Sequence, residues 1–167
     1  MIFQKKYLSL LIVFLTFHPF LDAQISQSIN GLSSNYIESV KSDEFGIIWI
    51  GTNEGLNALI DGRIYQYQQD LSDSTSILNS RINEIFLMDN NAIIALSNDG
   101  LSLFLRSKNS FKQIRTKTRP ISFDEDPFSN DIYLATENSS LIVLNNDLKI
   151  NHSYTFDVSD PSTISTN

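Results

Sequence analysis

The feature that most constrains this chain is a group of four short strand-like segments between residues 37 and 67. Each segment is rich in β-branched or aromatic residues and is bounded by Gly, Asp or Asn. The segments are Ile37–Lys41, Ile47–Thr52, Leu56–Ile60 and Ile64–Tyr67. Asp61-Gly62, between the last two, is a dipeptide that tolerates the positive φ angles of a tight hairpin. Together these signals predict a four-stranded antiparallel sheet.

The pattern then recurs, because Ile82 lies 45 positions after Ile37. The same spacing relates Val40 to Ile85, Ile48 to Ile93, Thr52 to Ser97, Asn53 to Asn98, Gly55 to Gly100 and Leu56 to Leu101. The second copy predicts strands at 82–87, 92–97, 101–105 and 111–114, and a diverged third copy predicts them at 121–123, 132–136, 141–144 and 154–156. Residues 159–164 echo residues 72–77, as if a fourth copy began there.

Four strands in each unit, repeated at a spacing in the forties, are typical of propeller blades. We therefore predict an all-β fold, a partial β-propeller of about three four-stranded blades plus the start of a fourth. The blades are expected at approximately residues 31–75, 76–118 and 119–163, within an incomplete propeller over residues 24–167.

The recurring residues resemble the two-component regulator propeller repeat, which forms the periplasmic sensing part of hybrid two-component sensors in Bacteroidetes-type bacteria. After Gly31–Ile37, the matching positions are Asp43, Gly46, Trp49, Gly51, Thr52, Gly55 and Leu56 in the first copy, and Asn98, Gly100 and Leu101 in the second. The match weakens along the chain: Ile94 and Leu96 replace Trp49 and Gly51, and Ser139-Ser140 stands at the turn glycine of the third copy. The resemblance implies a structural role for these residues and a sensing role for the propeller. In relatives the ligands are often breakdown products of polysaccharides.

The first residues differ in kind from the rest. Lys5-Lys6 precedes an apolar run of 11 residues, Tyr7–Phe17, which His18-Pro19 ends. The run is too short to span a bilayer as a helix, and with the small residue Ala23 it predicts a secretory signal peptide over residues 1–23. The expected location after cleavage near Ala23 is the periplasm or the exterior, and an uncleaved N-terminal anchor is the alternative.

Composition excludes several functions. The chain has 12 basic and 19 acidic residues with no basic domain, which disfavours a nucleic-acid partner. It contains no cysteine, so disulfides and thiol chemistry are excluded. His152 is the only histidine outside the signal peptide, and one histidine without cysteine does not make a typical zinc site. We expect no cofactor and no metal.

Individual residues leave alternatives open. Trp49 is expected to pack between neighbouring blades, with an exposed sugar-stacking platform as the alternative. Asp70 and Asp73 lack the spacing of a calcium loop, so a plain loop is favoured. The basic cluster Arg115–Arg119 is interpreted as a solvated loop, or alternatively as a site for an anionic ligand. The acidic turn 124–127 is expected to fill the slot of residues 43–46 in the first blade.

We therefore expect a non-catalytic, periplasmic ligand-sensing segment, truncated before its remaining blades, a membrane helix and a kinase. Its ligand is an oligosaccharide or another small extracellular molecule. Three blades cannot close a ring, since closed propellers have about four to eight, so missing blades or self-association are expected. One alternative is a secreted interaction module that oligomerises to close a ring. The other is a propeller enzyme dependent on His152, although no nucleophile or phosphate-loop motif is present.

Overall fold

The computed structural model describes residues 30–137, 140–145, 147–155 and 159–160. The chain divides into two units, Met1–Gly31 and Leu32–Asn167, and the strands lie in the second unit. The predicted signal peptide, residues 1–23, lies outside the described residues, as does most of the predicted start of a fourth blade at 159–164. In the part of the chain that is described, no helix is long and apolar enough to cross a membrane.

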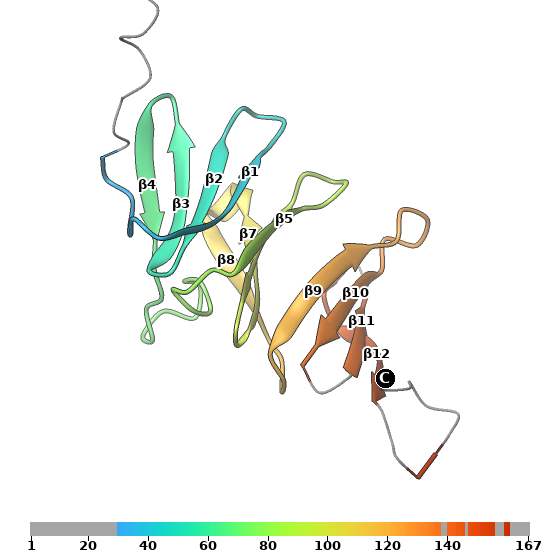
Figure 1. Ribbon diagram of the computed structural model, residues 1–167. Coiled ribbons are helices and arrows are strands. Elements are labelled where there is room, and N and C mark those ends of the chain that lie inside the picture. The colour runs from blue at the N-terminus through green and yellow to red at the C-terminus, as the bar shows by residue number, and fades with distance from the viewer. Residues whose placement is uncertain (1–29, 138–139, 146, 156–158, 161–167) are drawn as a thin grey trace, which may run out of the picture. The chain divides into compact units, whose positions relative to one another are not determined.

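The strands form three four-stranded antiparallel sheets, each made of consecutive strands (Figure 1). The first blade contains β1 (Ile37–Ser42), β2 (Ile48–Thr52), β3 (Gly55–Ile60) and β4 (Arg63–Tyr67). The second contains β5 (Glu84–Leu87), β6 (Ile93–Ser97), β7 (Gly100–Leu105) and β8 (Ser110–Arg115), with the 3-10 turn η2 (Arg106–Lys108) between the last two. The third contains β9 (Pro120–Glu125), β10 (Ile132–Thr136), β11 (Ser140–Leu144) and β12 (Ile150–Thr155). The predicted all-β fold of three four-stranded blades is confirmed.

Turn chemistry explains where several strands end. Asp61 and Gly62 have φ angles of 49° and 77°, so the hairpin has the two positive φ angles of a tight two-residue turn, and Ile60 pairs with Arg63 across it. Gly100 begins β7 at φ 139°, and a Cβ there would lie 2.0 Å from the Ile114 carbonyl oxygen. Only glycine can occupy that position without moving backbone.

Many strand ends differ from the sequence prediction by one residue, and two of the larger differences, at the starts of β5 and β12, have a physical cause. β5 begins at Glu84 rather than Ile82, because the Ile82 amide donates to the Thr52 carbonyl of the first blade (2.9 Å) before the ladder of the second blade starts. The outer strand of the third blade was predicted at residues 154–156, whereas β12 is Ile150–Thr155. All side chains of β12 are exposed, so its sequence does not alternate between buried apolar and exposed polar residues, and no such pattern marks its start.

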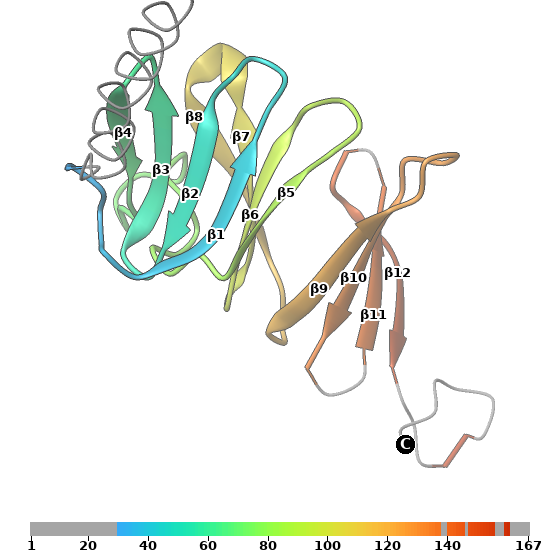
Figure 2. The ribbon, with the colours of Figure 1, turned by 45° about the horizontal axis from the view of Figure 1, so that its top comes forward.

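Apolar side chains gather into two clusters, each between successive sheets. The cluster between the first and second blades contains Trp49, Leu56, Ala58, Ile77, Ile82, Ile85, Ile93, Ala95, Phe104 and Phe111. The cluster between the second and third blades contains Met88, Ile94, Leu96, Leu101, Ile114, Ile132, Leu134, Ile142, Leu144 and Leu148. Complete burial of one large apolar side chain contributes about 1.5–3 kcal/mol, so these clusters are the main attraction between blades. Along the inner edge, β1 lies against β5 (Figure 2).

Each blade has two ends with different partners. At one end, the turns after β2 and β6 meet the segments that link the blades: Gln68 Nε2 donates to the Glu54 carbonyl (3.0 Å) and Asn79 Nδ2 to Asp99 Oδ2 (2.7 Å). We call this the linker end. The opposite end, which carries the turns after β1, β5 and β9, is called the turn end.

Candidate functional site

One hydrogen bond recurs in all three blades at the linker end. A buried Thr or Ser hydroxyl at the end of the second strand donates to the carbonyl of the residue that opens the third strand. The bonds join Thr52 to Gly55 (2.9 Å), Ser97 to Gly100 (3.1 Å) and Thr136 to Ser140 (3.2 Å). The hydroxyl satisfies a buried polar group at a tight turn, which gives these signature positions a structural role.

A second recurring bond fixes the segment that enters a blade. Asn57, fully buried on β3, accepts from the Ser33 amide and donates to the Ser33 hydroxyl, both at 2.9 Å. In the second blade Ser102 occupies the equivalent position on β7 and accepts from the Leu78 amide at 2.8 Å. Both bonds join residues 24 positions apart, so the repeat extends to tertiary contacts.

The remaining signature residues of this end pack or pair locally. Leu56 and Leu101 are fully buried, one in each apolar cluster. Gly51 faces the second blade, where an added Cβ would lie 2.7 Å from the Ile82 side chain. Asn98 Oδ1 accepts from Asn83 Nδ2 at 2.8 Å, which ties the turn after β6 to the start of its own blade.

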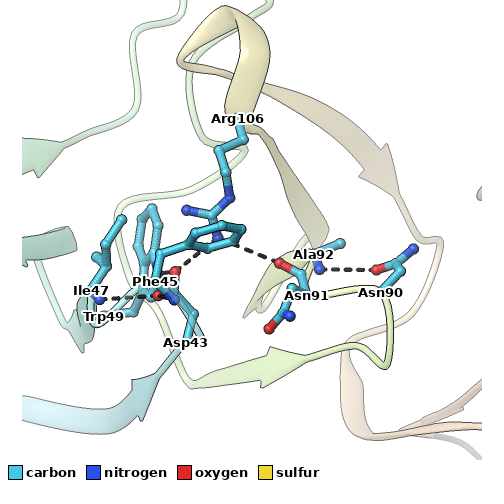
Figure 3. A network of polar contacts seen from close by, with 8 residues as sticks. All are labelled: Asp43, Phe45, Ile47, Trp49, Asn90, Asn91, Ala92 and Arg106. Atoms are coloured by element: carbon cyan, nitrogen blue, oxygen red, sulfur yellow. Dashed lines mark hydrogen bonds and ion pairs between the residues drawn. The ribbon is translucent and has the colours of Figure 1, made fainter.

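At the turn end, Asp43 is the centre of a network of polar contacts (Figure 3). Its Oδ1 accepts from the amides of Phe45 and Ile47, both at 3.0 Å, and so holds the turn that Gly46 completes at φ 76°. Its Oδ2 accepts from Trp49 Nε1 at 2.9 Å. The Asp43 side chain is completely buried, and every one of these donors lies within its own blade.

The second blade supplies the counter-charge. Arg106, in η2, donates to Asp43 Oδ2 at 2.8 Å, and its guanidinium lies 4.4 Å from the centre of the Phe45 ring (Figure 3). The same group donates to the Asn91 carbonyl at 3.4 Å. An arginine is thus held between a carboxylate and an aromatic ring, which is an arrangement suited to its flat, delocalised charge. We call Asp43, Phe45 and Arg106 the interblade clamp.

The environment of Asp43 shifts its pKa. Burial alone raises the pKa of the carboxyl group, but the hydrogen bonds from Trp49, Arg106 and the Ile47 amide, together with the positive charge of Arg106, outweigh burial. The pKa of Asp43 therefore lies below its usual value, and the group is charged near neutral pH. The clamp is a charged interaction across a blade interface, not a poised acid or base.

Trp49 packs between blades, as its sequence position predicted. It is 1% exposed and contacts Phe104 of the second blade edge-on, with ring centres 4.9 Å apart. Tyr67 stacks on Trp49 with ring centres 6.1 Å apart, and its ring centre also lies 5.7 Å from that of Phe104 and 5.2 Å from that of Phe111. This burial is incompatible with the alternative of an exposed platform for sugars.

The position of Asp43 differs between blades. Register places Met88 there in the second blade, because its amide donates to the Ala92 carbonyl (3.0 Å) as the Asp43 amide donates to that of Ile47 (3.0 Å). Met88 lies in the apolar cluster with Leu148 of the third blade, so an apolar contact replaces the clamp. In the third blade the position belongs to Asp126, two residues beyond the match expected from the sequence.

Other candidate residues show no gathering of chemical groups. Arg119 of the basic cluster pairs with Glu137 at 2.8 Å, and Lys112 nearby donates to a backbone carbonyl of the third blade. Asp70 and Asp73 each accept from groups of their own loop, such as the Ser72 hydroxyl at 2.6 Å. Among the described residues, no three His, Cys, Asp or Glu side chains are placed to hold a metal ion.

The loop that links the first and second blades borders two hollows of about 240 Å³ each. One is lined by polar groups of the loop and of β8, including Gln69, Asp70, Asp73, Gln113 and Arg115. The loop itself is fastened to β8, because the Phe111 amide donates to the Thr75 carbonyl (2.8 Å) and Gln113 Nε2 to that of Ser76 (3.0 Å). Hydrogen-bonding side chains therefore line both hollows.

Sequence reasoning missed the half of the clamp that comes from the second blade. Arg106 lies outside the recurring signature, and the equivalent position in the first blade is Asp61, since each residue directly follows the third strand of its blade. One signal was available in the sequence. Asp43 and Phe45 place a carboxylate and an aromatic ring in one short turn, and together these two groups favour binding of a cationic side chain.

Three antiparallel four-stranded blades, joined face to face and repeating one set of turn and hydroxyl bonds, define a partial β-propeller. Residues 31–54 match the two component regulator propeller family, so the resemblance seen in the first repeat is confirmed. The matched residues include the turn held by Asp43, the buried Trp49, and Thr52, whose hydroxyl bonds to the Gly55 carbonyl. No curated protein matches the chain significantly.

Solved structures share the fold. The extracellular domain of BT3049 of B. thetaiotaomicron, assigned as a hybrid two-component system, aligns with a TM-score of 0.65 and 22% identity over 76% of this chain and 19% of that chain. The extracellular domain of BT4673 of the same organism, assigned as a one-component system, aligns with a TM-score of 0.59 and 18% identity over 71% of this chain and 18% of that chain. Apo AztD of Citrobacter koseri aligns with a TM-score of 0.51 and 16% identity over 75% of this chain and 36% of that chain. The chain thus spans about a fifth of the two Bacteroides domains.

Proposed function

We propose that this chain is a non-catalytic, ligand-sensing propeller segment of a hybrid two-component sensor, located outside the cytoplasm. The observation that carries the proposal is the family match over residues 31–54, together with a fold like that of the extracellular domains of BT3049 and BT4673. Three of the described carboxylates support a non-catalytic role, because Asp43, Asp70 and Asp126 each accept hydrogen bonds within their own turn or loop. In this proposal the remaining blades, a membrane helix and the kinase belong to the complete sensor.

Export is the first part of the proposal, and it depends on the predicted signal peptide at residues 1–23. We expect the exported protein to begin at Gln24, which N-terminal sequencing of the protein from a periplasmic fraction measures directly. A cytoplasmic protein that retains Met1 would contradict the proposal. An exported protein that retains Lys5-Lys6 would instead identify an uncleaved anchor.

Ligand binding is the second part. The proposed ligand is an oligosaccharide, and the polar hollow beside the 70–79 loop is the candidate contact surface of this segment. Binding to the folded state raises stability by about 2.7 kcal/mol when the free ligand is at 100 times its Kd, so thermal unfolding of the whole ectodomain detects it. We expect at least one soluble oligosaccharide of a polysaccharide panel to raise Tm.

Matched variants test whether this surface takes part. Arg115 lines the hollow, whereas Lys117 has the same charge two positions away and does not line it. Arg115→Ala should weaken binding of the stabilising oligosaccharide and Lys117→Ala should not. No stabilisation by any member of the panel, or turnover of a substrate that His152→Ala abolishes, would contradict the sensing role.

A secreted interaction module remains the second candidate, because apolar side chains are exposed at both ends of the blade series. In the first blade Ile37 and Val40 are 51% and 53% exposed, and in the third blade Tyr154 is 49% exposed. A stable ring of two chains, observed by sedimentation of the exported protein, would favour this candidate over the sensor.

A further inference from the structure

Among the described residues, the face of the third blade opposite the second blade belongs to neither apolar cluster, and we call it the free face. Cross-strand pairs place Tyr133, Val143 and His152 in one row, and Ala135, Leu141 and Tyr154 in the next. Alternation puts Leu134 on the other face, inside the cluster shared with the second blade. Val143 is buried at 3% exposure, but Tyr133 is 37% and Tyr154 is 49% exposed, so this face carries two accessible aromatic rings.

The same positions of the first blade are an interface. Register matches Tyr133 to Trp49 and Ala135 to Gly51, because both pairs lie one and three positions beyond the first residue of their strands. Tyr154 matches Tyr67, since it pairs with Leu141 as Tyr67 pairs with Leu56. Trp49, Gly51 and Tyr67 all pack on the second blade. The free face of the third blade therefore carries the residues of a blade interface.

The turn beside this face also repeats the clamp. Asp126 Oδ1 accepts from the Phe128 amide at 2.9 Å, as Asp43 Oδ1 accepts from the Phe45 amide at 3.0 Å. Phe128 is 95% exposed, whereas Phe45 covers the guanidinium of Arg106. Asp126 Oδ2 accepts from the Ser129 hydroxyl at 3.0 Å and retains capacity to accept another donor. The carboxylate of Asp126 and the ring of Phe128 are both present, and no Arg or Lys among the described residues forms an ion pair with Asp126 or stacks on Phe128.

We propose that the free face of the third blade docks a further four-stranded blade, whose turn between its third and fourth strands presents an arginine to Asp126 and Phe128. Tyr133 and Tyr154 would pack against the third and fourth strands of that blade, as Trp49 packs on Phe104 of β7 and Tyr67 on Phe111 of β8. Arginine fits better than lysine, because its planar group can stack on a ring while it pairs with a carboxylate.

Charge distinguishes this occupant from a second copy of the chain. The first blade of a second copy offers Ile37, Val40 and Ile48 as an apolar surface, since these are the equivalents of buried residues in the second blade. Its turn between the third and fourth strands, however, carries Asp61 at the position of Arg106. Docking would set Asp61 against Asp126, and two like charges at an interface disfavour association. The proposal does not depend on the ligand-sensing role.

The second blade is itself a blade of the required chemistry, so it can serve as the probe. Tyr154 of the chain is joined directly to an additional copy of residues 68–115. This junction keeps the register, because Tyr154 stands at the position of Tyr67, which precedes residue 68. Hydroxyl-radical footprinting then reports the exposure of Tyr133, Tyr154 and Phe128 in the extended chain and in the original chain.

We expect the reactivity of all three rings to fall severalfold in the extended chain. Arg106→Ala in the added copy and Asp126→Asn should each restore the reactivity of Phe128, and the two together should restore no more than either alone. Asp147→Asn, an equal change of charge at an exposed position of the same blade, should have no effect.

Two results would overturn the proposal. One is full reactivity of Tyr133 and Phe128 in the extended chain, whether or not circular dichroism shows the added copy folded. The other is protection of Tyr133 in the original chain as its concentration rises, with sedimentation showing a dimer, because a second copy would then be the occupant.

Discussion

The interblade clamp makes a direct prediction for Asp43→Asn. Asparagine keeps the shape of the side chain and can still accept from the Phe45 and Ile47 amides. Its amide nitrogen, however, would face Trp49 Nε1 and Arg106, which are both donors. The substitution therefore leaves two donors without an acceptor and removes the counter-charge of Arg106.

The expected loss follows from the burial of the two groups. Breaking a buried charge pair typically costs about 3–5 kcal/mol, but the Arg106 side chain is 33% exposed and keeps its contacts with Phe45 and the Asn91 carbonyl. We therefore expect a loss of about 2–3 kcal/mol in the free energy of unfolding. With an m-value of about 2 kcal/mol/M in urea, the unfolding midpoint falls by about 1 M.

Trp49 provides the assay, because it is the only tryptophan and donates to Asp43. Urea unfolding of residues 24–167 is followed by its fluorescence at several pH values. The folded-state pKa of Asp43 lies below that of the unfolded chain, so its contribution is fully present above about pH 5 and is lost as pH falls through the folded-state pKa. In Asp43→Asn the free energy of unfolding should therefore fall less on acidification than in the original chain, by the part that protonation of Asp43 contributes.

A double-mutant cycle tests the pairing itself. Arg106→Gln together with Asp43→Asn should cost less than the sum of the two single changes, by about 1–2 kcal/mol. Asp61→Asn removes the same charge from an exposed turn of the same blade and should change stability by less than about 0.5 kcal/mol. Strict additivity of the two clamp substitutions would refute the reasoning, because it would show that Asp43 and Arg106 do not interact.

Three further predictions concern other contacts of the first two blades. Gly100→Ala should destabilise the chain by about 2 kcal/mol or more in urea unfolding, because its Cβ would meet the Ile114 carbonyl at a strained φ angle. Ser102→Ala should cost about 1–2 kcal/mol in the same assay, because the buried Leu78 amide loses its acceptor. Burial, and secondarily the charge of Tyr65, raise the pKa of Tyr67, so the unfolded chain ionises first and stability should fall as pH rises above about 10.

Each of these three changes has a control in the same two blades. Gly46→Asn should be tolerated, because Asn91 adopts a positive φ of 60° at the same point of the second blade. Ser110→Ala should be close to neutral, since that side chain is only partly buried. For the alkaline effect, Tyr67→Phe should remove the fall in stability attributed to Tyr67. An unchanged alkaline profile in that variant would contradict the assignment.

Most of the fold could be predicted from the sequence, because local signals and the repeat agreed. Asp61-Gly62 marked a hairpin, and the spacing of Ile37 to Ile82 marked the period, so strand order followed with little ambiguity. The burial of Trp49 was predictable from its apolar neighbours. The structure confirmed these points within a few residues at strand ends.

The partners of the signature residues could not be predicted, since they depend on contacts across blades. Asp43 looked like a turn residue, and its second role needs Arg106, which lies 63 positions away and outside the recurring signature. Likewise Asp126 was placed two positions out of register, because the turn of the third blade is longer and only the strand pairing shows which carboxylate takes the place of Asp43. The exposed strand β12 gave no hydrophobic pattern to read.

The change from Asp43 to Met88 at equivalent turns has a consequence for how repeats find their proper neighbours while the chain folds. Similar repeats can assemble in the wrong order, and such misassembly is a common failure of repeat proteins. If the third blade docked on the first, Asp43 would be buried near Leu148 instead of Arg106, and an uncompensated buried charge costs several kcal/mol. The two blade interfaces thus differ in chemistry. The free-energy penalty of burying Asp43 without Arg106 disfavours docking of the wrong blade and so selects the correct order of blades during folding.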